Sequence, residues 1–274
     1  MILDGRKVSN EIIENIKLKI EKLNLKIIFA IIWIGNDEAS SIYVNNKIKK
    51  CEYVGINVEL YHLENDVSET EVLNLIDELN NRVEVSGILL QSPIPNHIDI
   101  NKCFNKIDYR KDIDGFSNVS GGNLYLGNPS FISCTPKGII RLMDYYDIDL
   151  TGKNVCIINR SNIVGKPLFH LLISRNATVT MCHSKTIDLK KYTKKADIII
   201  TAVGKPKFIT KDMIKKGSVI IDVGISRVDG RVVGDVDFDH VSKKASYITP
   251  VPGGVGPMTI AMVLENILET IKEK

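Results

Sequence analysis

The sequence lacks paired cysteines. Its five cysteines are odd in number and widely scattered, with no Cys-x-x-Cys pair and no compact Cys/His set at zinc spacing. This pattern excludes a disulfide framework and a structural zinc site. We expect reduced thiols that lie mostly in a core, as in cytoplasmic proteins. The five are Cys51, Cys103, Cys134, Cys156 and Cys182.

The sequence also lacks long blocks of one charge and long apolar runs. The 36 Lys and Arg residues stand against 33 Asp and Glu residues, so a formal net charge of +3 is spread along the chain. No apolar run approaches a membrane span, and the start, Met-Ile-Leu-Asp-Gly-Arg, shows no charged-then-apolar leader. We therefore expect no nucleic-acid partner, no membrane contact and a cytoplasmic location.

Several catalytic signatures are missing as well. No group of His, Asp and Glu has metal-ligand spacing, so we predict no metal, and the chain has neither a nucleophile elbow nor a Walker loop. What is present is an ordinary globular composition, with 44% hydrophobic and 25% charged residues over 274 positions. That length suits two domains, or one large domain.

The first half alternates between helical periodicity and buried-strand runs. Apolar residues recur at helical spacing over residues 4–23, and the continuous apolar run over residues 26–34 is typical of a strand covered on both faces. Ser68 followed by acidic residues favours a helix start. This alternation indicates a parallel sheet. We predict helices over residues 4–23, 38–54 and 68–80, and strands over 26–34, 56–61 and 87–90.

The second half predicts an α/β fold with a doubly wound, Rossmann-type parallel sheet. Between residues 108 and 136 the pattern breaks into turns such as Gly121-Gly122, which predicts a domain junction. Thr135 as N-cap and Pro136 at the first helical position predict the next helix. Buried strands are predicted over residues 155–158, 178–182, 198–202 and 219–223. We expect one domain over 1–119, a second over 120–256, and a terminal helix over about 257–274 that starts at Gly256-Pro257 and packs back on the first domain.

Residues 154–172 have the pattern of a strand, a polar turn and a helix, which is the first unit of a dinucleotide fold. Such a helix start offers unpaired backbone N–H groups and a positive dipole end to a pyrophosphate. Of the three glycines of Gly-x-Gly-x-x-Gly, only the last is present, as Gly165, while Asn159 and Ser161 stand at the first two positions. Asn tolerates the left-handed backbone conformation, so a tight turn at Asn159 remains possible. An ordinary strand-helix unit is the alternative.

The residues after the second strand of this domain favour NADP over NAD. An NAD site usually places an acidic residue on the ribose hydroxyls, whereas a 2′-phosphate needs positive charge and hydroxyls. The string Cys182-His183-Ser184-Lys185 holds no acid. Arg160, Ser184 and Lys185 could therefore surround a 2′-phosphate.

The first half offers candidate reactive residues. Tyr43 and Lys47 are four residues apart, so on a helix they share one face and form a plausible acid/base or orienting pair; chance neighbours are the alternative. Gln91 directly follows a buried strand, at the edge where parallel sheets bind ligands, unless it belongs only to a proline-stiffened loop. Asp112 and Asp114 place two carboxylates at the junction, which a turn explains equally well.

The segment over residues 249–259, Thr-Pro-Val-Pro-Gly-Gly-Val-Gly-Pro-Met-Thr, is the most unusual one. Its three prolines and three glycines fix a rigid backbone with few side chains, which suits the close approach of a flat ligand. A linker that crosses between domains is the alternative.

Six strings together resemble the bifunctional methylenetetrahydrofolate dehydrogenase/methenyltetrahydrofolate cyclohydrolase family, FolD, over essentially the whole chain and in the same order. They are Ser-Ile-Tyr43-Val-Asn-Asn-Lys47, Gly-Ile-Leu-Leu-Gln91-Ser-Pro-Ile-Pro, Lys-Asp-Ile-Asp114-Gly-Phe, Arg-Ser-Asn-Ile-Val-Gly-Lys-Pro, Asp222-Val-Gly-Ile225 and the segment 249–259. The resemblance implies an N-terminal folate domain, a C-terminal Rossmann-type domain, a catalytic cleft between them and a homodimer. It also implies oxidation of 5,10-methylenetetrahydrofolate with NADP⁺ and hydrolysis of the methenyl product to 10-formyltetrahydrofolate, in one-carbon metabolism and purine biosynthesis.

The resemblance assigns residues by position. It gives Lys47 as the catalytic lysine, Tyr43 and Gln91 as its partners, and Asp114 as the folate-binding carboxylate. The implied cofactor positions are Asn159, Arg160, Ser161, Ser184 and Ile225, next to Gly165, and the folate-facing turn would include Gly253 and Pro257. Hydride loss needs orientation more than acid or base, because two nitrogens stabilise the resulting cation. Hydrolysis needs proton transfers, and next to that cation Lys47 could serve as a base near neutral pH.

Three departures from the family pattern stand out. The family usually has Gly where this chain has Asn159, which puts cofactor affinity in question. It commonly has Leu at the place of Ser92, and Asn and Arg at the places of Ser120 and Asn123. These last positions leave the set of Tyr43, Lys47, Gln91 and Asp114 intact.

Other functions compete with the one that the resemblance implies. A nucleotide-binding regulatory or scaffold protein would keep the fold and show no turnover. An NADP-dependent dehydrogenase of the shikimate type shares the two-domain plan and would act on another small substrate. A folate enzyme that has lost one of its two activities is the third alternative.

Overall fold

The structure is a computed structural model that describes residues 1–23 and 26–272. The chain forms two compact units. The N-terminal unit comprises Glu11–Ile132 with the last helix from Ile260 onward, and the C-terminal unit comprises Ser133–Thr259 with Met1–Asn10. The chain therefore passes from the N-terminal to the C-terminal unit between residues 132 and 133, whereas the junction was predicted between residues 119 and 120. Residues 273 and 274 of the predicted terminal helix lie outside the described residues.

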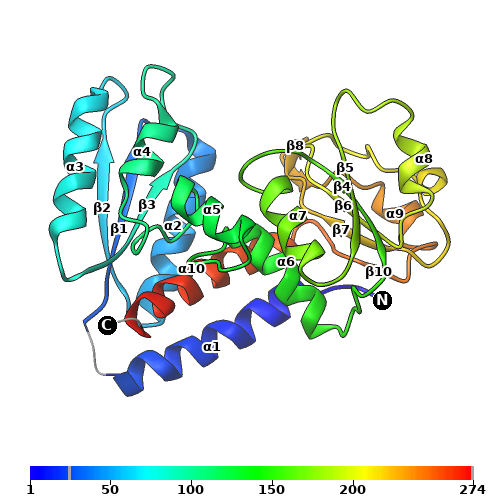
Figure 1. Ribbon diagram of the computed structural model, residues 1–274, viewed down its shortest axis with the longest axis horizontal. Coiled ribbons are helices and arrows are strands. Elements are labelled where there is room, and N and C mark those ends of the chain that lie inside the picture. Colours follow the sequence, from blue (N-terminus) through cyan, green and yellow to red (C-terminus); the bar gives the residue numbers. More distant parts are fainter. Residues whose placement is uncertain (24–25, 273–274) are drawn as a thin grey trace. The chain divides into compact units, whose positions relative to one another are not determined.

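A three-stranded parallel sheet of order β2-β1-β3 forms the centre of the N-terminal unit (Figure 1). The middle strand is apolar along almost its whole length because both its faces are covered. Its residues Ile28, Ala30 and Ile32 pack in one cluster with buried side chains of α3 and α4. The elements are α1 (Gly5–Leu23, which begins in the C-terminal unit), β1 (Ile28–Ile34), α2 (Glu38–Tyr53), β2 (Asn57–Leu63), α3 (Glu69–Asn81), β3 (Val85–Gln91), α4 (Ile100–Lys106) and α5 (Asn118–Tyr125).

Helix α3 confirms the helix start predicted at Ser68. The Ser68 hydroxyl accepts a hydrogen bond from the backbone N–H of Glu71 at 3.2 Å, and the Glu71 carboxylate accepts one from the backbone N–H of Ser68 at 3.0 Å. Two N–H groups that have no partner within the helix are thus satisfied reciprocally.

Helix α5 contradicts the turns predicted around Gly121-Gly122, because both glycines lie inside it. Ser117 caps this helix by accepting a hydrogen bond from the backbone N–H of Ser120 at 3.2 Å. The backbone N–H of Ser117 in turn donates to the buried Asp112 carboxylate at 2.8 Å. Anchoring from outside the helix therefore outweighs the low helix propensity of glycine.

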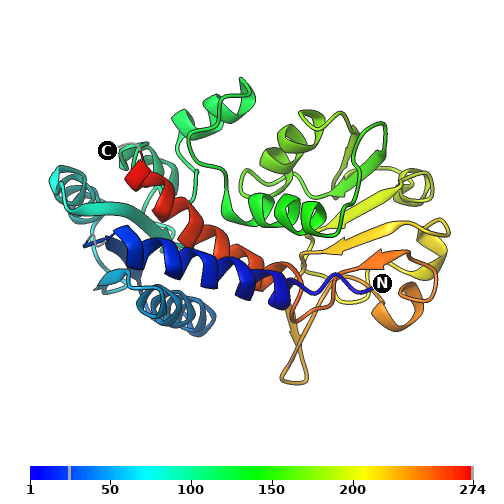
Figure 2. The same cartoon turned by 90° about the horizontal axis from the view of Figure 1, so that it is seen from below.

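The C-terminal unit contains a five-stranded parallel sheet of order β10-β7-β6-β4-β5. The four predicted strands are confirmed, and β10 was missed because it has only two residues. The start of the chain joins this unit: the backbone N–H of Leu3 donates to Ile248 O at 2.9 Å, and Figure 2 shows the N-terminus beside β10. The elements are α6 (Cys134–Tyr145), β4 (Asn154–Ile158), α7 (Gly165–Ile173), β5 (Thr178–Cys182), α8 (Leu189–Thr193), β6 (Ile198–Thr201), η1 (Lys211–Met213), β7 (Val219–Asp222), β8 (Ser226–Val228), β9 (Arg231–Val233), α9 (Phe238–Val241), β10 (Tyr247–Ile248) and α10 (Val255–Lys272).

Two predicted helix starts are wrong by a few residues. Helix α6 begins at Cys134, so Thr135 is not its cap and Pro136 is its third residue. Helix α10 begins at Val255, which places Pro257 within its first turn. Proline is tolerated at both places because the first N–H groups of a helix have no partner within it.

Candidate active site

Lys47 and Gln91 meet at the carboxyl edge of the sheet in the N-terminal unit. Gln91 is the last residue of β3 and is buried, and Lys47 lies half-buried on α2. The Lys47 Nζ donates a hydrogen bond to Gln91 Oε1 at 3.0 Å. Gln91 Nε2 donates to the backbone O of Ser92 at 2.6 Å, which fixes the amide so that its oxygen faces the amine. The structure thus brings together two residues that lie 44 positions apart.

Tyr43 lies one helical turn before Lys47 on α2 and is 38% exposed. The neighbouring Val44 is buried at 1% exposure, so the buried stripe of the helix runs beside the pair. Asp37 starts the helix by accepting a hydrogen bond from the backbone N–H of Ser40 at 2.7 Å, and this bond lowers the pKa of the Asp37 carboxyl. The first turn of α2 is thereby anchored ahead of Tyr43.

Asp114 stands in a loop that a second carboxylate holds in shape. Asp112 is only 2% exposed and accepts hydrogen bonds from the backbone N–H of Phe116 at 3.1 Å, the backbone N–H of Ser117 at 2.8 Å and the Ser120 hydroxyl at 2.8 Å. Asp114 lies half-buried between these anchored positions. The sequence showed two carboxylates here but not that they differ in this way.

The turn after β4 is organised by the side chain of Asn159. Its Oδ1 accepts hydrogen bonds from the backbone N–H of Ser161 at 2.8 Å and of Gly165 at 3.1 Å, and its Nδ2 donates to Ala202 O at 2.6 Å. Asn159 is not among the positive-φ residues, so the turn forms without the left-handed backbone conformation that asparagine tolerates. The side chain, rather than an unusual backbone conformation, makes the turn.

Gly165 keeps the role of a dinucleotide-motif glycine. A Cβ at this position would lie 2.4 Å from the backbone O of Asn159, so only glycine allows the helix to start this close to the strand end. The N–H groups of Val164 and Gly165 already donate to Ser161 Oγ (3.1 Å) and Asn159 Oδ1 (3.1 Å). The N–H of Lys166 also donates to Ser161 O at 3.0 Å, and Pro167 has no N–H, so the expectation of unpaired N–H groups is wrong for the first residues of this helix.

Arg160, Ser184 and Lys185 lie at one edge of the sheet. β4 and β5 are parallel neighbours, with Ile158 paired to Cys182, so the segments that follow both strands emerge at the same edge. All three side chains are exposed. No acidic residue stands between Cys182 and Lys185, so a guanidinium, an amine and a hydroxyl are available where a 2′-phosphate would sit. These residues fit NADP.

A buried pair of carboxylates, Asp222 and Asp235, lies at the ends of β6 and β7. Asp235 is fully buried and accepts hydrogen bonds from Thr201 Oγ1 (2.9 Å) and the backbone N–H groups of Val203 (2.7 Å) and Lys205 (2.8 Å). Burial raises the pKa of Asp222 to about 6, because it disfavours the charged form more than the hydrogen bonds received by this carboxylate favour it. Asp222 appeared in a sequence string without a role, and Asp235 was missed.

The proline- and glycine-rich segment begins next to this pair. The Thr249 hydroxyl accepts a hydrogen bond from the backbone N–H of Asp222 at 2.7 Å. Gly253 has a φ of +109°, which favours glycine, and its backbone O accepts a hydrogen bond from the N–H of Arg6 at 3.0 Å. Part of the close backbone approach expected of this segment is thus made by the chain's own first helix.

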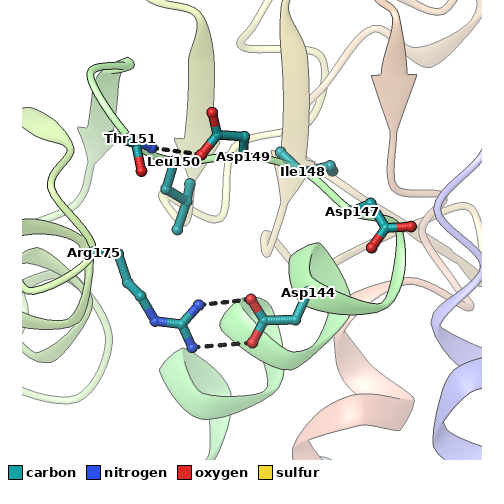
Figure 3. A pocket seen from close by; sticks show the side chains of 7 residues that line it. All are labelled: Asp144, Asp147, Ile148, Asp149, Leu150, Thr151 and Arg175. Atoms are coloured by element: carbon teal, nitrogen blue, oxygen red, sulfur yellow. Dashed lines mark hydrogen bonds and ion pairs between the residues drawn. The ribbon is translucent and has the colours of Figure 1, made fainter.

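A surface pocket of about 340 Å³ lies at the opposite edge of the same sheet (Figure 3). It is formed by the segments that precede β4 and β5, so it lies at the amino ends of these strands. Arg175 donates to both carboxylate oxygens of Asp144, at 2.7 and 3.0 Å. Arg175 and Asp144 thus form an ion pair in this pocket, beside the carboxylates of Asp147 and Asp149, and none of the predicted site residues lines it.

Within residues 1–23 and 26–272, no group of three or more His, Cys, Asp and Glu residues could hold a metal ion. No helix of that part of the chain is both long and apolar enough to cross a membrane. All five cysteines are free and buried, as predicted.

Comparisons with known proteins cover the whole chain. Residues 3–114 match the tetrahydrofolate dehydrogenase/cyclohydrolase catalytic domain, and residues 133–274 match the NAD(P)-binding domain of the same family. A bifunctional protein FolD from Clostridium novyi (strain NT) is 50% identical over 98% of this chain and 99% of its own length.

Solved structures give the same result. The bifunctional FolD methylenetetrahydrofolate dehydrogenase/cyclohydrolase of Campylobacter jejuni is 46% identical, with a TM-score of 0.98 over 100% of this chain and 99% of that one. The Trypanosoma brucei dehydrogenase-cyclohydrolase, complexed with NADP cofactor and inhibitor, is 33% identical with a TM-score of 0.96 over 100% and 97%. A shikimate dehydrogenase from Aquifex aeolicus shares the fold alone, at 12% identity and a TM-score of 0.54 over 88% and 91%.

Proposed function

The chain belongs to the tetrahydrofolate dehydrogenase/cyclohydrolase family, and we propose how its own residues carry out the two reactions of that family. It oxidises 5,10-methylenetetrahydrofolate with NADP⁺ to the methenyl compound and hydrolyses that compound to 10-formyltetrahydrofolate. We assign folate binding and proton transfer to the N-terminal unit and cofactor binding to the C-terminal unit. The observation that carries this assignment is the hydrogen bond of 3.0 Å between Lys47 Nζ and Gln91 Oε1.

Lys47 is the proton-transfer group of the hydrolysis. Water attacks the methenyl carbon, loses a proton, and the ring then opens at one nitrogen, which gains a proton. An amine held at the carboxyl edge of β3 can take the first proton and return it to the leaving nitrogen. Gln91 holds the amine in place, because its own amide is fixed by Ser92 O.

Tyr43 and Asp114 bind the folate. Tyr43 exposes its ring one turn from Lys47, where it can stack on the flat pterin or donate a hydrogen bond. The Asp114 carboxylate accepts hydrogen bonds from pterin N–H groups, and Asp112 keeps its loop in shape. We add Gly253 and Pro257 to the folate-facing positions, on the strength of the positive φ at Gly253 and the resemblance of the segment.

The cofactor residues are Asn159, Arg160, Ser161, Gly165, Ser184 and Ile225. NADP⁺, when bound, accepts the hydride from the methylene carbon. Arg160, Lys185 and Ser184 hold the 2′-phosphate, and the turn shaped by Asn159 and Gly165 receives the pyrophosphate. Ile225 is 49% exposed after β7 and offers an apolar surface to the cofactor.

A single assay of the purified chain tests both activities. Methylenetetrahydrofolate is mixed with NADP⁺, NADPH formation and methenyl absorbance are followed together, and the assay is repeated with NAD⁺. We expect NADPH without methenyl build-up, and slower turnover with NAD⁺. Accumulation of the methenyl compound would refute the cyclohydrolase activity, and no turnover with either cofactor would favour a nucleotide-binding protein without catalysis.

The assembly and the location are further parts of the proposal. A homodimer is expected from the resemblance, and the exposed apolar residues Val228 and Val232 of the β8–β9 pair are surface that a second copy could cover. Light scattering on the purified chain, with a mass near twice 30.6 kDa, would support it. The five buried, free cysteines suit a reducing compartment, so the cytoplasm is the proposed location.

A further inference from the structure

The carboxyl edge of the C-terminal sheet holds two buried carboxylates that the reactions described above do not use. Asp222 is 3% exposed and Asp235 is fully buried. Among the contacts of the described residues, each receives three hydrogen bonds, and most of the donors are backbone N–H groups. Burying two like charges side by side is unfavourable unless they organise the backbone around them.

Asp235 shapes the turn after β6. It accepts hydrogen bonds from Thr201 Oγ1, Val203 N and Lys205 N, so one carboxylate spans the whole turn. The backbone of Asp235 is also bonded to the segment around Ile209, because Ile209 N donates to Asp235 O at 2.9 Å. The turn is therefore held from a residue 30 or more positions away.

Asp222 shapes the turn after β7 and binds it to the same segment. It accepts hydrogen bonds from Gly224 N (3.0 Å), Asp235 N (3.0 Å) and Val236 N (2.9 Å). Thr201 and Asp222 are paired in the sheet, so the two turns are neighbours at one edge.

Two glycines make this arrangement possible. A Cβ at Gly224 would lie 2.2 Å from Asp235 Cγ, and a Cβ at Gly234 would lie 2.0 Å from Asp222 Oδ2. Each carboxylate thus packs directly on the backbone beside the other one. Any side chain at either glycine would push the two turns apart.

We call the Asp222 and Asp235 carboxylates, with the two turns that they hold, the brace. Its place in the sheet indicates which half of the cofactor would lie next to it. The sheet order is β10-β7-β6-β4-β5, and the candidate 2′-phosphate residues follow β4 and β5. With the pyrophosphate at the turn after β4, the other half of a dinucleotide extends over the ends of β6 and β7. Those ends are the two turns that Asp222 and Asp235 hold, and Ile225 follows Gly224 directly.

We infer that Asp222 and Asp235 are positioning residues that brace the nicotinamide-side binding surface, formed by the Val203–Lys205 turn and Ile225. This inference rests on the proposed function, because it assumes that the C-terminal unit binds NADP⁺. The two aspartates act through the turns and do not touch the reacting atoms. They set affinity for the part of the cofactor that NAD⁺ and NADP⁺ share, whereas Arg160 sets the preference between them.

The test compares two variants of the full chain with a matched control. D235N leaves one of the backbone N–H groups of Val203 and Lys205 without an acceptor, and G224A pushes a methyl group against the same carboxylate. D197N is the control: Asp197 accepts a hydrogen bond from Asn154 N at 2.8 Å and pairs with Lys215, just before β6 at the amino edge. Kd for NADP⁺ and NAD⁺ is measured by calorimetry, with Tm and methenyl hydrolysis on the same samples.

We expect D235N and G224A to raise Kd for NADP⁺ and for NAD⁺ by about tenfold or more, and by the same factor for both cofactors. Each variant breaks contacts of the brace and so misplaces the nicotinamide-side binding surface. D197N should bind both as the wild type does, even where its Tm falls. Tm reports whether each variant is folded, and methenyl hydrolysis, which consumes no cofactor, reports whether the N-terminal unit is intact. Wild-type affinity in both D235N and G224A, or an equal loss in D197N, would overturn the brace. Failure of the wild-type chain to bind NADP⁺ would overturn the proposed function with it.

Discussion

The two units present different chemistry at the carboxyl edges of their parallel sheets. In the N-terminal unit the edge carries the side chains to which we assign the reaction, namely an amine at 3.0 Å from an amide oxygen, with a phenol one turn away. In the C-terminal unit polar side chains such as Asn159 and Asp235 are turned toward backbone N–H groups. Under the proposed function, the reaction therefore uses a few side chains of special type, whereas the cofactor is held by turns of fixed shape.

The largest expected effect is at the reactive edge. K47M should lower methenyl hydrolysis by about 10²- to 10⁴-fold, the range of a positioned proton-transfer group. Decay of methenyl absorbance on supplied methenyltetrahydrofolate measures it. K49M is the matched control, because Lys49 is exposed on the same helix. Wild-type rates of hydrolysis by K47M would contradict the assignment of proton transfer to this edge of the N-terminal unit.

The next effect is at the binding edge. R160A should weaken NADP⁺ binding by about tenfold to a hundredfold, the worth of a charge-assisted hydrogen bond to phosphate, and leave NAD⁺ binding nearly unchanged. The ratio of KM values for the two cofactors measures the preference. An equal loss for both cofactors would place the 2′-phosphate elsewhere.

The pH dependence of stability tests how strongly burial affects the carboxylate of Asp222 in the C-terminal unit. The folded-state pKa of Asp222 is raised from 3.8 to about 6 by burial, so folding favours its protonated form. Its contribution to stability is fully present below pH 3.8 and is lost as the pH rises through 6, a change of about 3 kcal/mol.

The free energy of unfolding in urea should therefore rise in the wild type, relative to D222N, as the pH falls from 7 toward 4. The other carboxylate that faces Asp222 is Asp235, and Gly224 N, Asp235 N and Val236 N complete the contacts of its carboxylate. Below pH 6 a protonated carboxyl accepts fewer N–H groups, so KM for NADP⁺ should also rise. Parallel stability curves for wild type and D222N would contradict the assigned shift.

The smallest effect concerns the residue that replaces a motif glycine. N159D keeps the acceptor for Ser161 and Gly165 and loses the donor to Ala202 O, whereas N159A loses both. We expect N159A to lower the free energy of unfolding by about 1–3 kcal/mol and N159D by less. KM for NADP⁺ should rise a few-fold in N159A. Equal Tm values for the wild type and N159A would show that the turn holds its shape without the side chain.

Much of the reactive edge could be predicted from the sequence, and little of the bracing could. Gln91 could be proposed from its place at a strand end, and Lys47 from its spacing to Tyr43 on a helix, whereas the pairing of Lys47 with Gln91 was implied only by the resemblance. Asp235 does not follow from the sequence, because its partners lie more than 25 positions away and most of them are backbone N–H groups. Helix α5 was missed for a different reason: the nearby side chains of Asp112 and Ser117 hold a glycine-rich segment that has little helix propensity. Strand β10 has only two residues, too few for a pattern.

The most direct measurement is one time course with K47M, methylenetetrahydrofolate and NADP⁺, in which NADPH and methenyl absorbance are recorded together. Because hydride loss depends on orientation rather than on an acid or base, we expect NADPH to form while the methenyl compound accumulates in equal amount. NADPH formation without any methenyl build-up would contradict the assignment of hydrolysis to Lys47.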